Sequence, residues 1–240
     1  MPTPLKGPEA KSVEAMFARI SRRYDFLNTA MTLGMHHRWK RLTASLAAGK
    51  DQGPALDVAT GTGDLAFQLA GLPGITSVIG VDFCPEMLRL ARDKLRDSPT
   101  SRPVTFQLGD ALRLEFKDDT FVCATSGFAL RNVESIEGSI SEMQRVVRPG
   151  GRVVVLELTP LVGRSIFTSL LKLYFNHGVP LLGQLLAGDR KAYTYLPNSV
   201  TRFPNADELA EVFRGVGLTG VSYRRMNLST VAIHWGNKPG

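Results

Sequence analysis

The stretch PALDVATGTGDLAFQLA, residues 54–70, decides the fold. Its first part, Pro54–Ala59, is a short apolar run that predicts a buried strand, and Asp64–Ala70 has the apolar spacing of a helix. Between them, Gly61 and Gly63 predict a tight turn. Open α/β sheets bind nucleotides at such a turn, because glycines let the backbone approach the ligand. The turn alone fits an NAD-type fingerprint as well as any other nucleotide site.

The alternation of strand and helix continues towards the carboxyl end. Further strands are predicted at Ser77–Val81, Val104–Leu108, Phe121–Thr125 and Arg152–Glu157. Helices are predicted at Pro85–Leu95, Ser135–Val147 and Ala206–Val216, a turn at Pro149–Gly151, and a final hairpin at Gly220–Arg225 with Thr230–Trp235. This order predicts a doubly wound, mostly parallel α/β sheet that is covered by helices on both faces.

Two regions fall outside this alternation. Apolar residues from Val13 to Ile20 recur at helical spacing and predict an amphipathic helix with a basic side, and a second helix is expected at His36–Ala48. Residues 160–204 are much longer than an ordinary connection, so we expect a helical insertion that acts as a lid. We therefore divide the chain into an amino-terminal helical cap, residues 1–50, and a main domain, residues 51–240.

The composition is that of an ordinary folded domain. Apolar residues make up 43% and charged residues 21% of the 240 residues, which excludes disordered, collagen-like and disulfide-rich chains. The net charge of +7 allows attraction to nucleic acid, anionic lipid or an anionic substrate, and it does not choose among them. The two cysteines, Cys84 and Cys123, form no CxxC pair, which favours a reduced, cytoplasmic setting.

No stretch of the sequence predicts a membrane-spanning helix. The most apolar region, Leu170–Ala187, is interrupted by Lys172, His177 and Pro180, so it is too short to cross a bilayer. It is suited to touching a membrane surface. The first residues do not resemble a secretory signal either.

Three carboxylates follow three successive predicted strands. Asp57 lies in the first turn, where it can accept backbone hydrogen bonds or hold an ammonium group. Asp82 ends the second strand, where a carboxylate can accept both hydroxyls of a ribose. Asp110 follows the third strand and can accept the amine of an adenine. A dinucleotide site would use Asp82 but has no role for the other two.

With these residues, the chain from Asp57 to Trp235 resembles the class I S-adenosylmethionine-dependent methyltransferases. The resemblance implies a seven-stranded Rossmann-like sheet. It also implies a set of cofactor-binding residues: Asp57, Thr60, Gly61, Thr62 and Gly63 on the methionine side, Asp82 at the ribose, Asp110 and Ala111 at the adenine, and Gly127. Ala59 stands where many members have glycine.

Further motifs make the chain similar to the ubiquinone/menaquinone biosynthesis C-methyltransferases of the UbiE/MenG type. YDFLN at 24–28, followed by His36 and Trp39, resembles the first signature of that family. RVVRPGG at 145–151 resembles the second. GFALRNV at 127–133 and YTYLPNSVTRFP at 193–204 complete the likeness, which covers nearly the whole chain.

The resemblance implies methylation of a polyprenyl quinol ring, since the reduced ring is electron-rich and the quinone is not. In this reading Arg131 stabilises the phenolate, Asn132 orients a hydroxyl or a water, and Tyr24 stacks on or hydrogen-bonds the ring. The methyl donor is S-adenosylmethionine. No metal is expected, because His36 and His37 have no carboxylate at ligand spacing.

The expected substrate is demethylmenaquinol, with a polyprenyl benzoquinol of ubiquinone biosynthesis as the alternative. An NAD-dependent oxidoreductase and an RNA methyltransferase are more remote, and no nucleic acid partner is expected because no RNA-binding motif is present. The basic first helix and the apolar insertion favour peripheral contact with the inner face of the membrane. The oligomeric state is left open, with a homodimer among the alternatives.

Overall fold

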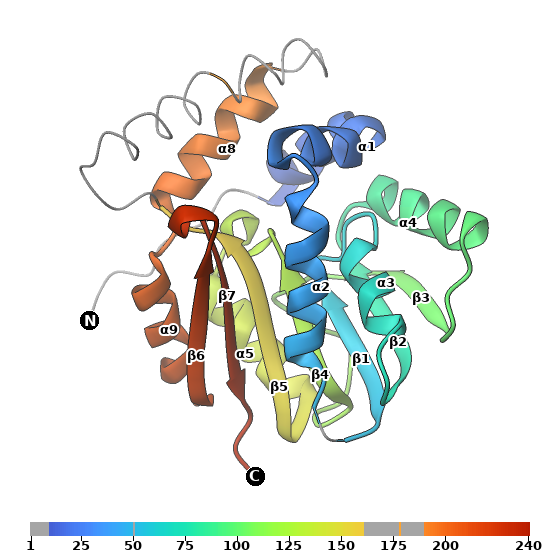
Figure 1. The fold of residues 1–240 in the computed structure, drawn as a ribbon, viewed down its shortest axis with the longest axis vertical. Coiled ribbons are helices and arrows are strands. Elements are labelled where there is room, and N and C mark those ends of the chain that lie inside the picture. The colour runs from blue at the N-terminus through green and yellow to red at the C-terminus, as the bar shows by residue number, and fades with distance from the viewer. Residues whose placement is uncertain (1–9, 50, 161–177, 179–189) are drawn as a thin grey trace.

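A computed structural model describes residues 10–49, 51–160, 178 and 190–240 of the chain. Seven strands among them form one sheet in the order β3-β2-β1-β4-β5-β7-β6 (Figure 1). The strands are β1 (Gly53–Val58), β2 (Ile75–Asp82), β3 (Val104–Leu108), β4 (Phe121–Gly127), β5 (Val147–Leu158), β6 (Thr219–Met226) and β7 (Val231–Asn237). β7 runs in the direction opposite to that of the other six strands of this sheet. The expected doubly wound, mostly parallel sheet is confirmed.

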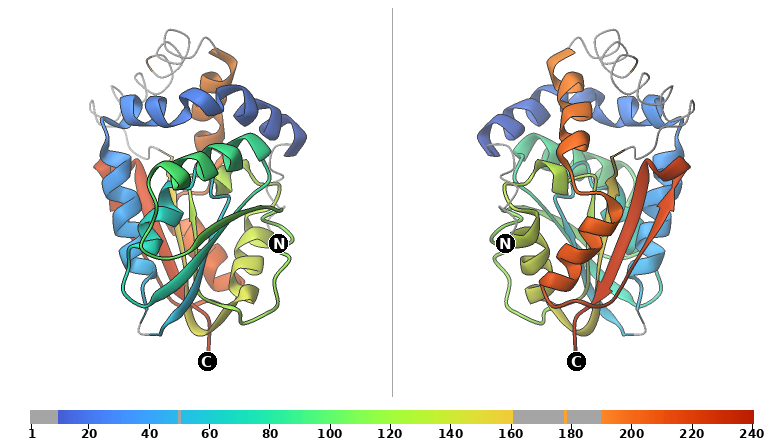
Figure 2. Two further views of the ribbon diagram at one scale, coloured as in Figure 1. Left: turned by 90° about the vertical axis from the view of Figure 1, so that its right-hand side faces the viewer. Right: turned by 90° about the vertical axis from the view of Figure 1, so that its left-hand side faces the viewer.

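Helices cover both faces of the sheet. They are α2 (Met35–Ala47), α3 (Asp64–Ala70) and α4 (Pro85–Asp97) on one face, and α5 (Ile136–Val146) and α9 (Ala206–Gly215) on the other (Figures 1 and 2). Two of these helices begin at residues whose side chains cap the first turn. The Ser135 side chain accepts a hydrogen bond from Gly138, and Asn205 forms a capping box with Glu208.

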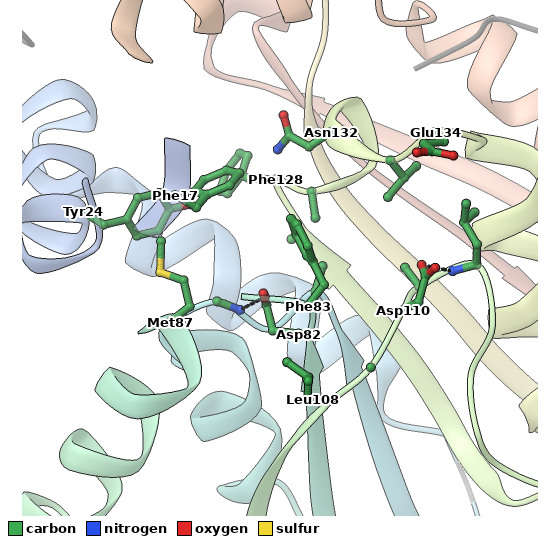
Figure 3. A pocket seen from close by; sticks show the side chains of 18 residues that line it. Phe17, Tyr24, Asp82, Phe83, Met87, Leu108, Asp110, Phe128, Asn132 and Glu134 are labelled. Carbon is green, nitrogen blue, oxygen red and sulfur yellow. Dashed lines mark hydrogen bonds between the residues drawn. The ribbon is translucent and has the colours of Figure 1, made fainter. Parts of the chain in front are cut away.

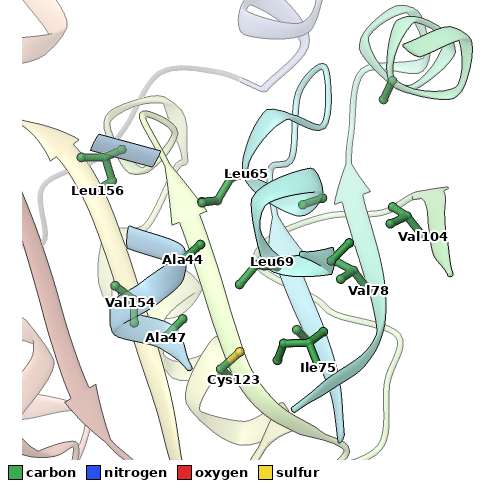
Figure 4. Close-up of a cluster of buried hydrophobic side chains, with 14 of the residues drawn as sticks. Ala44, Ala47, Leu65, Leu69, Ile75, Val78, Val104, Cys123, Val154 and Leu156 are labelled. Carbon is green, nitrogen blue, oxygen red and sulfur yellow. The ribbon is translucent and has the colours of Figure 1, made fainter. Parts of the chain in front are cut away.

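One hydrophobic core lies on each face of the sheet, and successive residues of a central strand point alternately into one core and the other. In β4, Cys123 packs with α2 and α3 (Figure 4), whereas Ala124 faces α5. In β5, Val154 and Val155 alternate in the same way. Because side chains alternate across a strand, an uninterrupted apolar run is what a strand covered on both faces requires.

One predicted turn is wrong. Pro149–Gly151 was expected to be a turn before a strand, but these residues belong to β5 itself. The pairing with β4 shifts there, because Phe121 is opposite Val147 and Cys123 is opposite Arg152. The extra residues of β5 form a bulge, in which Gly150 has a φ of +79° and donates its N–H to Lys238 O at 2.9 Å.

The first helix of the amino-terminal region is longer than expected. The first helix, α1, spans Ala10–Thr32 and includes the whole YDFLN motif, because no glycine or proline interrupts it before Gly34. It lies over the carboxyl ends of the parallel strands (Figure 1). In contrast, α2 packs directly on the sheet through Trp39, Ala44 and Ala47.

The described part of the predicted insertion is helical. α8 (Arg190–Arg202) crosses α1 at the carboxyl ends of the strands (Figure 2), and Tyr195 packs with the apolar residues of α1. Residues 161–177 and 179–189 of the insertion lie outside the described residues. Within the described part of the chain, each helix is too short or too polar to cross a bilayer.

Candidate active site

A cavity of about 390 Å³ opens at the carboxyl ends of the parallel strands (Figure 3). This volume lies in the range of small-molecule and cofactor sites. Its wall includes seven of the predicted site residues: Tyr24, Gly61, Asp82, Asp110, Ala111, Gly127 and Asn132. The fold therefore brings the expected cofactor loop and two of the three expected catalytic residues to one space.

The turn after β1 forms one edge of this cavity. Gly61 has a φ of +56°, and a Cβ atom there would have open space within 4 Å. Gly63 has a φ of +84°, and a Cβ atom there would lie 2.7 Å from Phe106. Gly61 thus leaves room on the ligand side, whereas Gly63 permits close packing on the protein side. Ala59 also has a left-handed backbone, with a φ of +53°, so the departure from glycine strains this turn.

Asp82 holds the turn in place from the end of β2. Its Oδ2 accepts the Gly61 N–H at 2.7 Å and its Oδ1 accepts the Cys84 N–H at 2.9 Å. Burial raises the pKa of Asp82 to about 6, although the backbone donors oppose this shift. Asp82 also lies on the cavity wall, so its carboxylate can accept hydroxyls from a ligand there.

Asp57 lies beneath the turn and outside the cavity wall. It is buried and accepts hydrogen bonds from the hydroxyls of Thr60 at 2.6 Å and Thr125 at 2.8 Å. Burial raises the pKa of this carboxyl to about 6, and the two hydroxyls act against the shift. Asp57 and Thr60 therefore shape the turn from below and do not line the cavity.

Asp110 and Ala111 lie on the cavity wall after β3. Asp110 is exposed, and its Oδ1 accepts the N–H of Leu112 at 2.9 Å, which fixes the turn at that edge. Its second oxygen is available to a ligand. Leu108, at the end of β3, adds an apolar side chain to the same wall, below Asp82 in Figure 3.

Thr62 connects the cofactor turn to α1 through a network of charges. Its hydroxyl donates to Asp25 Oδ1 at 2.7 Å, and Lys94 contacts Asp25 Oδ2 at 2.7 Å. Lys94 also contacts Asp64 at 2.7 Å, and Lys40 contacts the other oxygen of Asp64 at 2.7 Å. Burial acts to raise the pKa of Asp64, but both lysines outweigh it and hold the pKa well below its usual range.

This network was not predicted from the sequence. Asp25, Lys40, Asp64 and Lys94 come from four helices, and each alone resembles a surface charge. Asp25 belongs to the YDFLN motif, which was the one available signal. The network keeps α1, and with it Tyr24, against the cofactor turn.

The aromatic side of the cavity comes mainly from α1 and the end of β4. Phe17 and Tyr24 pack edge to face with ring centroids 5.9 Å apart. Phe128 also lies on the wall, and its ring packs edge to face on Trp39 with ring centroids 6.2 Å apart. Phe128 has a φ of +59°, a conformation that a bulky residue rarely adopts outside a functional site. Phe17 and Phe128 carried no predicted role.

Arg131 is not on the described wall of the cavity. Its side chain is 8% exposed, and Nη1 contacts Glu157 Oε1 at 2.6 Å and Phe128 O at 2.5 Å. Glu157 ends β5 and is fully buried, and burial raises its pKa although Arg131 opposes the shift. The guanidinium is therefore engaged in holding the Phe128 turn.

Asn132 and Tyr24 do line the cavity, as expected. Asn132 is 9% exposed, and its Oδ1 accepts a hydrogen bond from the Tyr195 hydroxyl at 3.0 Å. Tyr195 belongs to the quoted YTYLPNSVTRFP motif but had no predicted role. The motif was the only sequence feature that pointed to Tyr195, and its hydrogen bond to Asn132 places it next to the cavity.

A buried thiol and a pair of histidines, of which His36 is buried and His37 exposed, lie near the cofactor turn. Cys84 precedes α4, and burial raises the pKa of its thiol to about 11. His36 and His37 stack on each other, and a carboxylate oxygen of Asp64 lies within 4.8 Å of their ring nitrogens. The spacing of residues around His36 and His37 in the sequence does not reveal this carboxylate, and both of its oxygens already contact lysines.

We expect Lys94→Met to reduce the free energy of unfolding by about 1–2 kcal/mol, because it leaves two partly buried carboxylates with fewer partners. Urea unfolding measures this loss, and limited proteolysis of α1 should accelerate. On the same helix, Arg89→Met breaks an exposed pair with Asp93 at 3.1 Å and should change stability by less than about 0.5 kcal/mol. Equal losses in the two variants would contradict the role of the network.

Comparison with known proteins identifies the family. The model of the ubiE/COQ5 methyltransferase family matches residues 5–238. The "Ubiquinone/menaquinone biosynthesis C-methyltransferase UbiE" of Desulfotalea psychrophila is 40% identical over 97% of this chain and 92% of its own. The "Demethylmenaquinone methyltransferase" of a Roseiflexus species is 41% identical over 99% of each chain. A solved S-adenosylmethionine-dependent methyltransferase of Thermotoga maritima shares the fold, with a TM-score of 0.65 and 18% identity over 93% of this chain and 98% of that one. The chain belongs to the ubiE/COQ5 methyltransferase family.

Proposed function

We propose that this protein transfers a methyl group from S-adenosylmethionine to a ring carbon of a polyprenyl quinol, with demethylmenaquinol as the substrate. One observation carries the proposal: a single cavity joins the cofactor turn at Gly61 and Asp82 to an aromatic wall at Phe17, Tyr24 and Phe128. The names of the relatives, which include demethylmenaquinone methyltransferases of Roseiflexus and Thermus, support the choice of substrate.

The cofactor edge fits S-adenosylmethionine residue by residue. Asp82 would accept the ribose hydroxyls and Asp110 with Ala111 would border the adenine. Gly61 and Gly127 present backbone at the wall, where a side chain would take up space. Asp57, Thr60, Thr62 and Gly63 would act indirectly, because they fix the turn from outside the cavity. When bound, S-adenosylmethionine supplies a methyl group made electrophilic by its sulfonium.

The aromatic edge fits a flat quinol ring. Tyr24, Phe17 and Phe128 would stack around the ring and hold its reacting carbon in line with the methyl group, which is most of the catalysis that such a transfer needs. A new bond forms from the ring carbon to the methyl carbon as the bond from that carbon to sulfur breaks. The ring carbon then loses its proton to water, and the aromatic ring is restored.

The polar groups of the site would act on the quinol oxygen. Asn132 is placed to donate to it, which stabilises the quinolate that pushes charge onto the ring carbon. Arg131 was expected to have that role, and we now propose that it positions Phe128 and η1 (Leu130–Asn132) through Glu157. The proposed steps require no metal, because the sulfonium already makes the methyl group electrophilic.

The direct test incubates the protein with labelled S-adenosylmethionine and one quinol at a time under reducing conditions. We expect label in demethylmenaquinol and little in the oxidised quinone, because only the reduced ring is electron-rich. A polyprenyl benzoquinol is the second arm, since other relatives carry the ubiquinone/menaquinone name. Absence of transfer to both quinols would contradict the proposal.

The raised pKa of Asp82 predicts that cofactor binding depends on pH. Between about pH 4 and pH 6, Asp82 is ionised in the unfolded chain but still protonated in the folded protein without cofactor, because its folded pKa is about 6. This group therefore lowers the free energy of unfolding as the pH rises through that window. Ribose hydroxyls prefer the ionised carboxylate. We therefore expect cofactor affinity to fall about tenfold from pH 7.5 to pH 5.

Isothermal calorimetry across this pH range measures the effect. Asp82→Asn should bind weakly and with little pH dependence. Asp57→Asn is the matched control, because it removes a carboxyl of similar pKa that lies outside the cavity, and its pH dependence should persist. A flat profile in the unmutated protein would refute the assignment of Asp82 to the ribose.

We also propose peripheral contact with an anionic membrane on the cytoplasmic face, because a polyprenyl quinol resides in lipid. Leu33 and Leu228 are 86% and 66% exposed and lie at the α1–α2 turn and in η3 (Asn227–Ser229), on the same side of the molecule (Figure 2). Both have left-handed backbones, with φ values of +50° and +56°, which are costly for leucine. The net charge of +7 favours anionic lipid.

Co-sedimentation with vesicles tests this contact. We expect binding to vesicles that contain phosphatidylglycerol, weak binding to pure phosphatidylcholine, and at least a tenfold loss in the double variant Leu33→Ser, Leu228→Ser. The variant should keep its cofactor affinity, which shows that it is folded. Undiminished vesicle binding would mean that another surface meets the membrane.

A further inference from the structure

We propose that Tyr195 is a positioning residue that fixes the side-chain amide of Asn132, so that Nδ2 faces the cavity and donates to an oxygen of the bound quinol. The inference rests on the proposed function, since it assigns the group that stabilises the quinolate. It also moves this role from Arg131, whose guanidinium contacts Glu157 and Phe128, to the neighbouring residue.

Among the described contacts, only the oxygen end of the Asn132 amide has a hydrogen-bond partner. The Tyr195 hydroxyl donates to Oδ1 at 3.0 Å, so Oδ1 points towards α8. Figure 3 shows the amide nitrogen on the other side, towards Phe128 and Tyr24. The oxygen is thus used by the protein, and the donor hydrogens are presented to the cavity.

The backbone of Asn132 does not depend on Tyr195. Its N–H donates to Ala129 O at 2.8 Å, and the Arg131 N–H lies 3.4 Å from Glu157 Oε2. The position of the side chain is therefore set by η1. What the Tyr195 hydroxyl adds is the direction of the amide, because the two ends of an amide have nearly the same shape and differ in hydrogen bonding.

The ring of Tyr195 has its own support. It packs with the apolar cluster of α1 that contains Met16, Ile20 and Leu27. A phenylalanine would keep this packing and lose only the hydroxyl. Tyr195→Phe therefore removes one hydrogen bond and leaves the packing of the ring unchanged.

The surroundings keep the hydroxyl protonated. Burial raises the pKa of Tyr195, and the nearby Glu157 acts in the same direction while Arg131 and Arg202 oppose it. A protonated hydroxyl can donate to Oδ1 at any working pH. Without it, the amide can turn and present its oxygen to the quinolate, where two acceptors repel.

The central experiment is a double-mutant cycle on methyl transfer to the reduced quinol. Tyr195→Phe should lower kcat roughly tenfold, the scale of one hydrogen bond, and leave the Kd of S-adenosylmethionine unchanged. Asn132→Ala should lower kcat further. In the Asn132→Ala background, Tyr195→Phe should have no additional effect, because the residue acts through Asn132.

A pH profile separates positioning from general structural support. In Tyr195→Phe the quinol ionises less readily in the site, so the rise of kcat should move to higher pH, and alkaline pH should partly restore turnover. Tyr223→Phe is the matched control: it removes a hydroxyl that bonds Asp207 on the surface, far from the cavity, and should change neither kcat nor the profile.

Two outcomes would overturn the inference. One is additive losses in the cycle, and the other is an unshifted pH profile in Tyr195→Phe. Failure of the proposed function looks different, since the unmutated protein would then methylate neither quinol. In that case the same cycle measured by thermal unfolding still tests the contact, because Tyr195 and Asn132 should show coupled losses of stability and additive ones would refute it.

Discussion

The carboxylate of Asp64, held between Lys40 and Lys94, is the interaction on which the site depends. It lies at the start of α3, directly after the cofactor turn, and its two partners come from α2 and α4. Lys94 passes the connection to Asp25 on α1. An ordinary α/β sheet binds a ligand at the ends of its strands without a roof. Here one charged group ties the floor of the site to the helix that supplies its aromatic wall.

The parts of the fold that could be predicted from the sequence are those that depend on a few neighbouring residues. The strand, turn and helix of residues 54–70 follow from local chemistry, since an apolar run, glycines with positive φ and a helical apolar face each act over a few residues. The hairpin at the carboxyl end is local in the same sense. The bulge at Pro149–Gly151 was missed because it depends on the register with β4, and register is a property of two strands.

Site residues that directly follow a strand could be predicted from the sequence. Residues whose role depends on the direction of the side chain could not be predicted as well. Asp82 and Asp110 line the cavity because the ends of parallel strands meet at one edge. Arg131 and Asn132 are neighbours in a short 3₁₀ turn, so they point in different directions, and only one can face the cavity. Tyr195 and Asp64 act across separations of many residues. No local pattern shows which partner such a side chain will meet.

Cys84 shows how the site tolerates the chemistry of its proposed substrate. The oxidised form of a quinol is an electrophile that adds to thiolates. With a pKa of about 11, only about one thiol in ten thousand is ionised at pH 7, and the side chain is fully buried beside Asp82. Cys123 is shielded further, with a pKa of about 12. Both thiols are therefore buried and held in their protonated form, which disfavours their addition to an oxidised ring, although Cys84 places a sulfur atom next to the cofactor turn.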